Sequence, residues 1–316
     1  MGHPAELQVA AVLFSVAIPV FNRAELLQKT LASVWRQTFS DFELIVVDDG
    51  STDGTLEYLR SLNGRVRVFA QPHKGPGTAR TRAAKHAKGE YPAFLDSDDL
   101  WFPWTLKCFA EVIKKFHRPA FIAGNVLDFH NEVELASIRE MELQADGFMD
   151  YLACHENGYF AGAGMSVIRR DELLKTGGYT EQPINAEDHD LALRLGNSPG
   201  FVQIISPVTV GWRRHSGSIT QNLQRSIAGS FYLIKQESRG CYPGGHARRI
   251  ARRQIITRHI RPVLLACLRE GKRREAWELY RATLSWHVRL GRVRFLTSYP
   301  PLAVFASFRS ALRNFG

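Results

Sequence analysis

The chain has 316 residues, of which 45% are hydrophobic and 23% are charged, and this composition is that of an ordinary globular protein with one large domain or two smaller ones. The four cysteines are widely spaced and form no CxxC pair, which argues against a zinc knuckle and against a disulfide framework. We therefore expect four buried free thiols, at Cys108, Cys154, Cys241 and Cys267.

The formal net charge of +10 is unevenly distributed along the chain. From residue 226 onward the sequence has 18 Lys and Arg against 4 Asp and Glu, whereas residues 1–225 have 23 against 27. Such asymmetry suggests an acidic partner surface for the C-terminal part, either lipid headgroups or nucleic acid. The longest uncharged segment, residues 7–21, is too short to span a membrane, and the N-terminus lacks a secretory pattern, so we expect a cytoplasmic protein.

The first 120 residues alternate between strand-like and helix-like patterns. Apolar, β-branched segments that predict strands lie at 14–20, 42–50, 65–72 and 91–95. Each is followed by a segment that predicts a helix, at 24–38, 53–62, 75–87 and 103–116. Four successive β-then-α units predict an α/β fold with a mostly parallel sheet and helices on its faces.

The pattern loosens after residue 120. It predicts one strand over 120–129, a strand that runs into a short helix over 162–179, a short helix over 185–196 and a further strand beginning at 201 that leads to a basic loop. From about residue 223 the texture is helical, with a helix pair turned at Gly271. We place a domain boundary near 225, with a first domain at 1–225 and a basic helical region at 226–316.

Polar residues follow each of the first four predicted strands. They are Asn22, Asp48, Asp49, His73, Lys74, Asp96, Asp98 and Asp99. Because ligands of parallel sheets bind at the carboxyl ends of the strands, these residues define a candidate site. A carboxylate such as Asp49 at a strand tip can accept from the N3–H of a uracil ring or from ribose hydroxyls. The alternative is a plain β-to-α turn with Asp53 as the helix N-cap, which does not explain the acidic pair before Gly50. The glycine-bearing segment 73–80 suits a phosphate, with Arg80 reaching a base, a phosphate or only solvent.

The segment "DSDD" (96–99) places three carboxylates within four positions, and like charges so close repel unless a cation binds. Hard cations such as Mg²⁺ or Mn²⁺ are commonly held by one or two carboxylates plus substrate phosphates, which the spacing of Asp96 and Asp98 suits. We expect Asp99 to cap the helix that begins near Pro103. In "AEDHD" (186–190), one carboxylate at a cleft would serve as a general base. His215 would either complete a metal site or be a solvated or core histidine, which is the commoner case for a lone His.

These motifs together resemble those of family 2 glycosyltransferases, which have the GT-A (Rossmann-like) fold and invert the configuration of a nucleotide-sugar. The stretches "VAIPVFNRAELLQKTLASVWRQTFSDFELIVVDDGSTDGT", "GPGTARTRAA", "FLDSDD", "GGY…AEDHDL" and "WRRHSGSIT" occur in the family's order over residues 13–222. One position departs, since Thr81 stands where the family usually has Asn. The helical region after residue 225 is not covered by the resemblance.

The resemblance implies a site and a reaction. It assigns Asp188, with Glu187 beside it, to catalysis as the base, and Asp98 with His215 to a Mg²⁺ or Mn²⁺ ion. It assigns nucleotide binding to Pro19, Phe21, Asn22, Asp49, Lys74, Arg80, Asp96 and Ser97. The implied enzyme transfers a hexosyl or N-acetylhexosaminyl group from a nucleotide-sugar, a UDP-sugar by preference, to a hydroxyl of a glycan or glycolipid.

Two other functions stay open at this point. A sugar nucleotidyltransferase would also use carboxylates and a metal, but it usually has a glycine-rich basic loop after the first strand, where this sequence has "PVFNRAE". A non-catalytic nucleic-acid-binding protein would explain the basic C-terminal region, which however lacks a nucleic-acid motif.

We expect no nucleic-acid partner. Instead we expect the basic region, together with the sparsely charged segment 295–315, to bind anionic lipid peripherally at the inner face of the cell membrane. The alternative is a solvated basic face on helices that only pack against the first domain.

Overall fold

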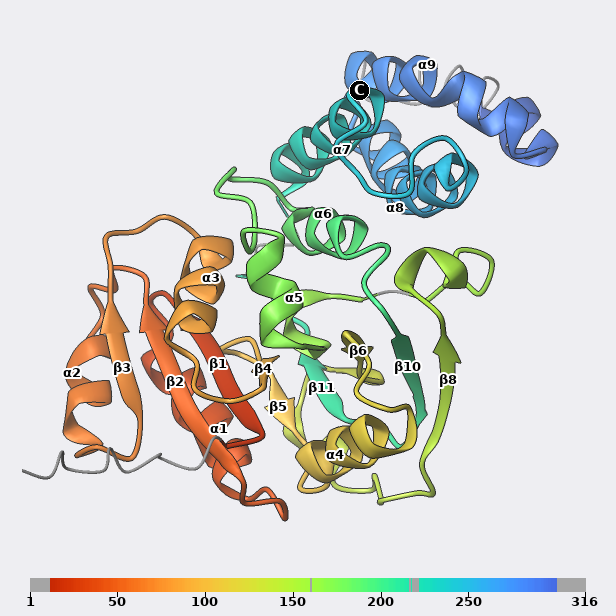
Figure 1. The fold of residues 1–316 in the computed structure, drawn as a ribbon. Coiled ribbons are helices and arrows are strands. Elements are labelled where there is room, and N and C mark those ends of the chain that lie inside the picture. The colour runs from red at the N-terminus through yellow and green to blue at the C-terminus, as the bar shows by residue number, and fades with distance from the viewer. Residues whose placement is uncertain (1–11, 160, 216, 218–221, 300–316) are drawn as a thin grey trace, which may run out of the picture. The chain divides into compact units, whose positions relative to one another are not determined.

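The computed structural model describes residues 12–159, 161–215, 217 and 222–299 (Figure 1). The chain divides into two compact units that interleave along the sequence. We call the first the sheet unit; its described residues lie within 1–146, 163–178 and 202–213. We call the second the helical unit; its described residues lie within 147–162, 179–201 and 214–316. This division by contacts does not coincide with the boundary near residue 225, which stays a prediction about where the catalytic part ends.

An eight-stranded sheet organises the sheet unit, with strand order β3-β2-β1-β4-β9-β6-β10-β8. Its strands are β1 (Phe14–Val20), β2 (Phe42–Asp48), β3 (Arg67–Ala70), β4 (Tyr91–Phe94), β6 (Phe121–Ala123), β8 (Gln144–Phe148), β9 (Ser166–Ile168) and β10 (Phe201–Ser206). The pairs β1–β2, β1–β4 and β2–β3 are parallel, whereas β9 runs antiparallel to β4 and β6. The carboxyl ends of the first strands therefore meet at one edge, as the sequence predicted, and Figure 1 shows these strands side by side.

A second, three-stranded sheet contains β5 (Leu100–Trp101), β11 (Val210–Arg213) and β7 (Val126–Phe129), in the order β5-β11-β7. The prediction of one strand over 120–129 is therefore wrong, because the chain leaves the large sheet after β6 and joins the small one as β7. The cause is the turn at Gly124, where an added Cβ would lie 2.5 Å from Thr209 Oγ1. That hydroxyl accepts a hydrogen bond from Asn125 N at 2.9 Å and so redirects the chain.

Helices of the sheet unit begin and end close to the predicted positions. They are α1 (Ala24–Trp35), α2 (Thr55–Ser61), α3 (Pro76–His86), α4 (Thr105–Lys115), α5 (Arg170–Lys175), and the 3-10 turns η1 (Glu132–Leu135) and η3 (Ala163–Met165). α1 buries Leu27, Leu31 and Val34 completely, at the spacing of one helix face. The predicted α/β fold with a mostly parallel sheet flanked by helices is confirmed.

The helical unit contains α6 (Glu187–Arg194), α7 (Leu223–Ser238), α8 (Arg249–Arg269), α9 (Arg273–Arg289) and the 3-10 turn η2 (Tyr151–Cys154). α8 packs against both α7 and α9, and Ile256, Ile260 and Leu264 are fully buried on one of its faces. Gly271, with φ of 71°, allows the left-handed turn between α8 and α9. The predicted helical region and its turn are confirmed.

Two further expectations meet different outcomes. Cys241 is exposed while the other three cysteines are buried, so the prediction of four buried thiols is wrong at that position, which lies in the turn after α7. No helix in the described residues is long and apolar enough to cross a membrane. The predicted interfacial segment 295–315 lies mostly outside the described residues, from residue 300 onward.

Candidate active site

The turn that follows β2 is built on two buried carboxylates. Asp48 is 1% exposed and Asp49 is 2% exposed. Asp48 Oδ2 accepts from the backbone N–H groups of Gly50 at 3.3 Å and Ser51 at 3.2 Å. Its Oδ1 is buried without a hydrogen-bond partner, which is costly and leaves one acceptor available to a ligand or water.

Asp49 holds the loop that precedes α3. Its Oδ1 accepts from Gln71 Nε2 at 2.7 Å and from Lys74 N at 3.0 Å. Its Oδ2 accepts from Gly75 N at 2.7 Å and lies 2.9 Å from His73 Nδ1. A carboxylate offers about four lone-pair sites, so these contacts use them all. Recognition of a base by Asp49 would therefore replace one of these hydrogen bonds, and its assigned role stays a prediction.

Two rings lie at the rim above this turn. The Phe21 ring stacks on the His73 imidazole with centroids 4.0 Å apart, and Phe21 is 40% exposed. Asn22 has φ of 50°, and its Oδ1 accepts from Thr52 N at 2.8 Å, which ties the end of β1 to the turn after β2. Exposed planar rings on a fixed backbone suit stacking by a nucleobase. Of the other predicted nucleotide contacts, Pro19 is buried in β1, and Lys74 is exposed.

The acidic turn after β4 consists of Asp96, Ser97, Asp98 and Asp99. Asp96 Oδ1 accepts from Arg80 Nη2 at 2.5 Å, and Arg80, on α3, is only 4% exposed. Ser97 is buried, whereas Asp98 is half-buried with Oδ2 3.6 Å from Arg23 Nη2. The sheet unit therefore brings Arg80 and Asp96 together as an ion pair, and it leaves part of the Asp98 carboxylate accessible.

Asp99 is not a helix cap, contrary to our expectation. Its Oδ1 accepts from Arg213 N at 2.8 Å, and the α4 N-terminus has no side-chain cap. Burial raises the pKa of Asp99 well above its usual range, and the charges of Asp96 and Asp98 raise this pKa further. Asp99 faces the interior and is bound by β11, so it cannot turn toward the helix.

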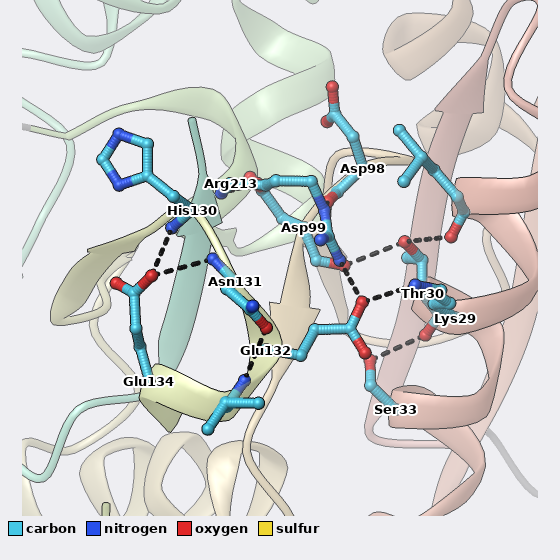
Figure 2. Close-up of polar contacts among 12 residues, drawn as sticks. Lys29, Thr30, Ser33, Asp98, Asp99, His130, Asn131, Glu132, Glu134 and Arg213 are labelled. Carbon is cyan, nitrogen blue, oxygen red and sulfur yellow. Dashed lines mark hydrogen bonds and ion pairs between the residues drawn. The ribbon is translucent and has the colours of Figure 1, made fainter. Parts of the chain in front are cut away.

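Arg213 is a site residue that sequence reasoning missed, and Figure 2 shows its contacts. Its Nε donates to the Asp98 carbonyl oxygen at 2.9 Å, and its Nη2 lies 3.1 Å from Glu132 Oε1. Lys29 Nζ donates to the same Glu132 oxygen at 2.8 Å. Arg213 is thus held between the acidic turn and η1. No local pattern signals this, because Asp98 and Arg213 are 115 residues apart.

The acidic turn fits a divalent cation. An added Cβ at Gly164 would lie 2.8 Å from Asp96 Oδ2, so the absence of a side chain there leaves room for the carboxylate. Within the described residues, no three or more His, Cys, Asp or Glu side chains converge to hold a metal. Mg²⁺ is commonly bound by one or two protein carboxylates together with phosphate oxygens, and the turn offers Asp96 and Asp98 for such an arrangement.

The helical unit contains the predicted base. Asp188 Oδ1 accepts from His189 N at 2.7 Å and lies 2.8 Å from His189 Nδ1. The His189 ring packs on the His259 ring of α8 with centroids 4.0 Å apart. Burial tends to raise the pKa of Asp188, but the contacts with His189 and the charge of His259 outweigh it, so this pKa lies below its usual value. The sequence did not predict either histidine as a site residue.

The other acidic residues of α6 differ in their contacts. Asp190 is 1% exposed; its Oδ2 accepts from Arg194 Nη2 at 2.8 Å, and its Oδ1 accepts from Tyr242 OH at 3.0 Å. These bonds make Asp190 a structural link rather than a base. Glu187 Oε2 accepts from Ala186 N at 3.2 Å. His215 belongs to the same unit and is half-buried, and its assignment to the metal stays a prediction.

Comparison with known proteins identifies the family. The sequence model of Glycosyl transferase family 2 matches residues 15–176, which is half of the chain, and this chain belongs to that family. The resemblance stated from the motifs is thereby confirmed. Among solved structures, S. aureus TarS in complex with UDP-GlcNAc superposes with a TM-score of 0.66 and 20% identity, covering 85% of this chain and 81% of that one. This likeness shows the fold.

Curated relatives match shorter parts. Chondroitin synthase of Pasteurella multocida is 31% identical over 194 residues, covering 60% of this chain and 19% of that one. The Escherichia coli UDP-Glc:alpha-D-GlcNAc-diphosphoundecaprenol beta-1,3-glucosyltransferase WfgD is 34% identical over 115 residues, covering 36% of this chain and 45% of that one. An uncharacterized glycosyltransferase of Rickettsia felis is 45% identical over 91 residues, covering 28% of this chain and 15% of that one. The chain thus spans less than half the length of each.

Proposed function

We propose that this protein is an inverting glycosyltransferase that moves a hexosyl or N-acetylhexosaminyl group from a UDP-sugar to a hydroxyl of a glycan or glycolipid. The observation that carries this proposal is the acidic turn at the carboxyl end of β4, in a chain of Glycosyl transferase family 2. Family membership disfavours a sugar nucleotidyltransferase and a nucleic-acid-binding protein. WfgD, whose name gives a UDP-Glc donor and a diphosphoundecaprenol-linked acceptor, supports this class of donor and acceptor.

The nucleotide would bind at the edge formed by β1, β2 and β4. Its base would stack on the Phe21–His73 ring pair, and its ribose would contact the turn that Asp96 begins, where Arg80 fixes the carboxylate. Lys74 and the loop before α3 would face the phosphates, because a helix N-terminus attracts negative charge. Binding at a prearranged edge fixes the anomeric carbon for attack from one side.

The base would be Asp188. Its carboxylate is ionised at neutral pH, as that of an ordinary Asp would be, and can accept the proton of the attacking acceptor hydroxyl. His189 would fix the orientation of this carboxylate through the bonds to Oδ1, so that Oδ2 is directed to the acceptor. Glu187 would add negative charge beside it. Attack on the face opposite the leaving diphosphate inverts the anomeric configuration.

A Mg²⁺ or Mn²⁺ ion would be held by Asp98, with His215 as a further ligand, and when bound it would neutralise the charge of the leaving diphosphate. Asp99 keeps its proton to higher pH than an ordinary carboxyl, because burial and its two acidic neighbours raise its pKa. Asp96, which forms an ion pair with Arg80, would be the second carboxylate available to the ion.

The decisive experiment is a screen of sugar transfer and donor hydrolysis across UDP-, GDP- and dTDP-sugars with purified full-length protein and Mn²⁺. We expect turnover with one or more UDP-sugars and a product of inverted anomeric configuration, read by NMR. Asp98→Asn is the matched inactive control, since the side-chain size is unchanged. Activity with a nucleoside triphosphate and a sugar phosphate instead would contradict the proposal.

For a partner surface we propose an anionic membrane at the inner face of the cell membrane. On α9, Trp277, Leu284 and Val288 are 44%, 38% and 60% exposed at positions i, i+7 and i+11. The exposed Arg281 lies on the same stripe. A helix face that combines exposed apolar side chains with arginines suits the boundary between headgroups and acyl chains.

A further inference from the structure

Three arginines of the helical unit gather at one face of α8, two from α8 itself and one from the segment after α9. Arg258 and Arg261 are on this face of the helix, and so are Gln254 and Thr257, at positions i, i+3, i+4 and i+7 from Gln254 onward. Arg292, which follows α9, donates through Nη1 to Thr257 Oγ1 and through Nη2 to the Gln254 carbonyl oxygen at 3.4 Å. Its guanidinium is therefore fixed on the same stripe as the other two.

No carboxylate balances these cations. In the described part of the chain, none of the three forms an ion pair with Asp or Glu; Arg258 Nη2 donates only to the carbonyl oxygen of His155, at 2.6 Å. Burial lowers the pKa of Arg292 to about 10, and the charges of Arg261 and Arg258 contribute to this lowering. Burial and the charge of Arg258 also lower the pKa of Arg261. The charges that lower the pKa values of Arg261 and Arg292 are thus all positive.

His287 on α9 adds an unused donor to the cluster. Its side chain is 0% exposed, and neither ring nitrogen has a hydrogen-bond partner. Burial lowers its pKa to about 4, and the charges of Arg292 and Arg261 lower it too, so the ring is neutral and carries one N–H. Arg261 Nε is likewise buried without a partner. Buried donors without acceptors are rare in folded proteins and indicate a missing ligand or water.

The same helix shows how this fold treats a buried arginine when no ligand is needed. Arg252 is 3% exposed, and its Nε donates to Glu237 Oε2 at 2.7 Å. Its Nη1 donates to the carbonyl oxygens of Pro243 and Gly245 at 2.8 and 2.9 Å. Nothing comparable supports Arg261. The contrast argues that the cluster of Arg258, Arg261, Arg292 and His287 is completed by an anion from outside the chain.

We propose that this cluster is a binding site for a phosphate group. A phosphate carries up to two negative charges and several acceptor oxygens, and guanidinium forks match its geometry in pairs, whereas a carboxylate has only two oxygens to share among three arginines. The phosphate is free in solution or belongs to a phospholipid headgroup. All four residues belong to the helical unit, and the occupancy of this site does not depend on transfer activity.

The test measures anion binding by titration calorimetry with the full-length protein, without divalent cations, using inorganic phosphate and pyrophosphate. We expect Arg261→Gln to weaken the Kd of this site at least tenfold, and Arg261→Lys to weaken it less, because the charge remains but the fork is lost. Arg269→Gln, a change of an exposed arginine on the same helix, is the control and should bind like the unchanged chain.

Two more readouts decide the outcome. Because Arg261→Gln removes a repelling charge, the ligand-free melting temperature should stay equal or rise; a variant that fails to fold would overturn the proposal. Co-sedimentation with phosphatidic acid vesicles distinguishes the sources, since a headgroup site loses vesicle binding in Arg261→Gln but not in Arg269→Gln. Unchanged binding of phosphate, pyrophosphate and vesicles in Arg261→Gln, or no binding by the unchanged chain, would also overturn it.

Discussion

The Asp188–His189 pair sets the chemistry expected at the level of single residues. Asp188→Asn keeps the size of the side chain and removes its ability to accept a proton, so turnover should fall by ~10² to 10⁴ while the Kd for the donor stays within about twofold. Steady-state kinetics and calorimetric titration with the UDP-sugar measure the two quantities. Near-normal turnover would move the role of base to Glu187, because Asp190 is occupied by Arg194 and Tyr242.

His189 gives a prediction about pH. Although burial tends to raise the pKa of Asp188, the hydrogen bonds and charge of His189 hold it below its usual value. The ionised form is therefore maintained as the pH falls, until the pH reaches this lowered pKa. In His189→Leu the opposing contribution is lost and the pKa of Asp188 rises. The acidic limb of the pH profile of kcat should then move to higher pH, whereas a purely structural role of His189 would lower kcat equally at all pH values.

For single residues, the sequence predicts where a side chain lies in the fold better than it predicts which groups that side chain contacts. Asp49, Asp96 and Asp98 could be placed at strand ends because the β-then-α pattern is local and regular. Their contacts could not be placed, since Arg80 reaches Asp96 and Arg213 reaches Asp98 from distant elements. Asp99 is an example. The sequence pattern predicted a helix cap, but the Asp99 carboxylate accepts instead from the backbone N–H of Arg213, 114 residues away.

Two glycines lie so close to other parts of the sheet unit that an added Cβ would displace the atoms it meets. In Gly164→Ala the new Cβ would meet Asp96 Oδ2, the end of a side chain that can move, at 2.8 Å. We expect a displaced carboxylate, a weakened contact with Arg80 and roughly tenfold weaker donor binding, with little change in melting temperature. Calorimetric titration and thermal denaturation test this, and unchanged donor affinity would contradict the role given to Asp96.

Gly89→Ala is the matched comparison. There the new Cβ would lie 2.6 Å from backbone atoms of Phe14 and Ser15 in β1, which cannot move without shifting the strand. We expect a loss of ~1 to 3 kcal/mol of stability, the usual cost of overpacking, because backbone rather than a side chain must give way. Denaturant titration measures this free energy of unfolding. A stable Gly89→Ala variant would show that the start of β1 tolerates displacement.

For helices and strands, regular apolar periodicity allowed the prediction, whereas turns that depend on distant residues could not be predicted. The helices and parallel strands of the first 120 residues were found from apolar spacing alone. The division of 120–129 between two sheets was not, because it depends on the close approach of Thr209 to Gly124, 85 residues earlier in the chain. β8 was not predicted either, because its residues are exposed or half-buried and lack an apolar face.

For the whole molecule, the charge asymmetry read from the sequence acquires a structural location. The basic region forms α7, α8 and α9 and packs with α6 in the helical unit. Gly229 of α7, for instance, lies so close to Ala186 that a Cβ would meet its side chain at 2.9 Å. Removing residues after 225 would expose this face of α6 and take away Tyr242, the partner of Asp190. A membrane-binding test therefore needs substitutions in the full chain rather than a truncation.

The exposed stripe of α9 provides those substitutions. Changing Trp277, Leu284 and Val288 together to Gln removes apolar surface without altering charge. It also removes the stacking of Trp277 on Tyr280, whose ring centroids lie 5.4 Å apart, so the melting temperature of the variant is measured alongside. If α9 lies at a membrane surface, the full-length protein should float with anionic liposomes at low salt and the triple variant should lose most of this binding, because both apolar burial and attraction to headgroups contribute. The control replaces Val133 and Met141, which are 75% and 67% exposed in the sheet unit, by Gln. Equal flotation with neutral liposomes, or equal loss in the control, would defeat the proposal, since binding would then depend neither on lipid charge nor on α9.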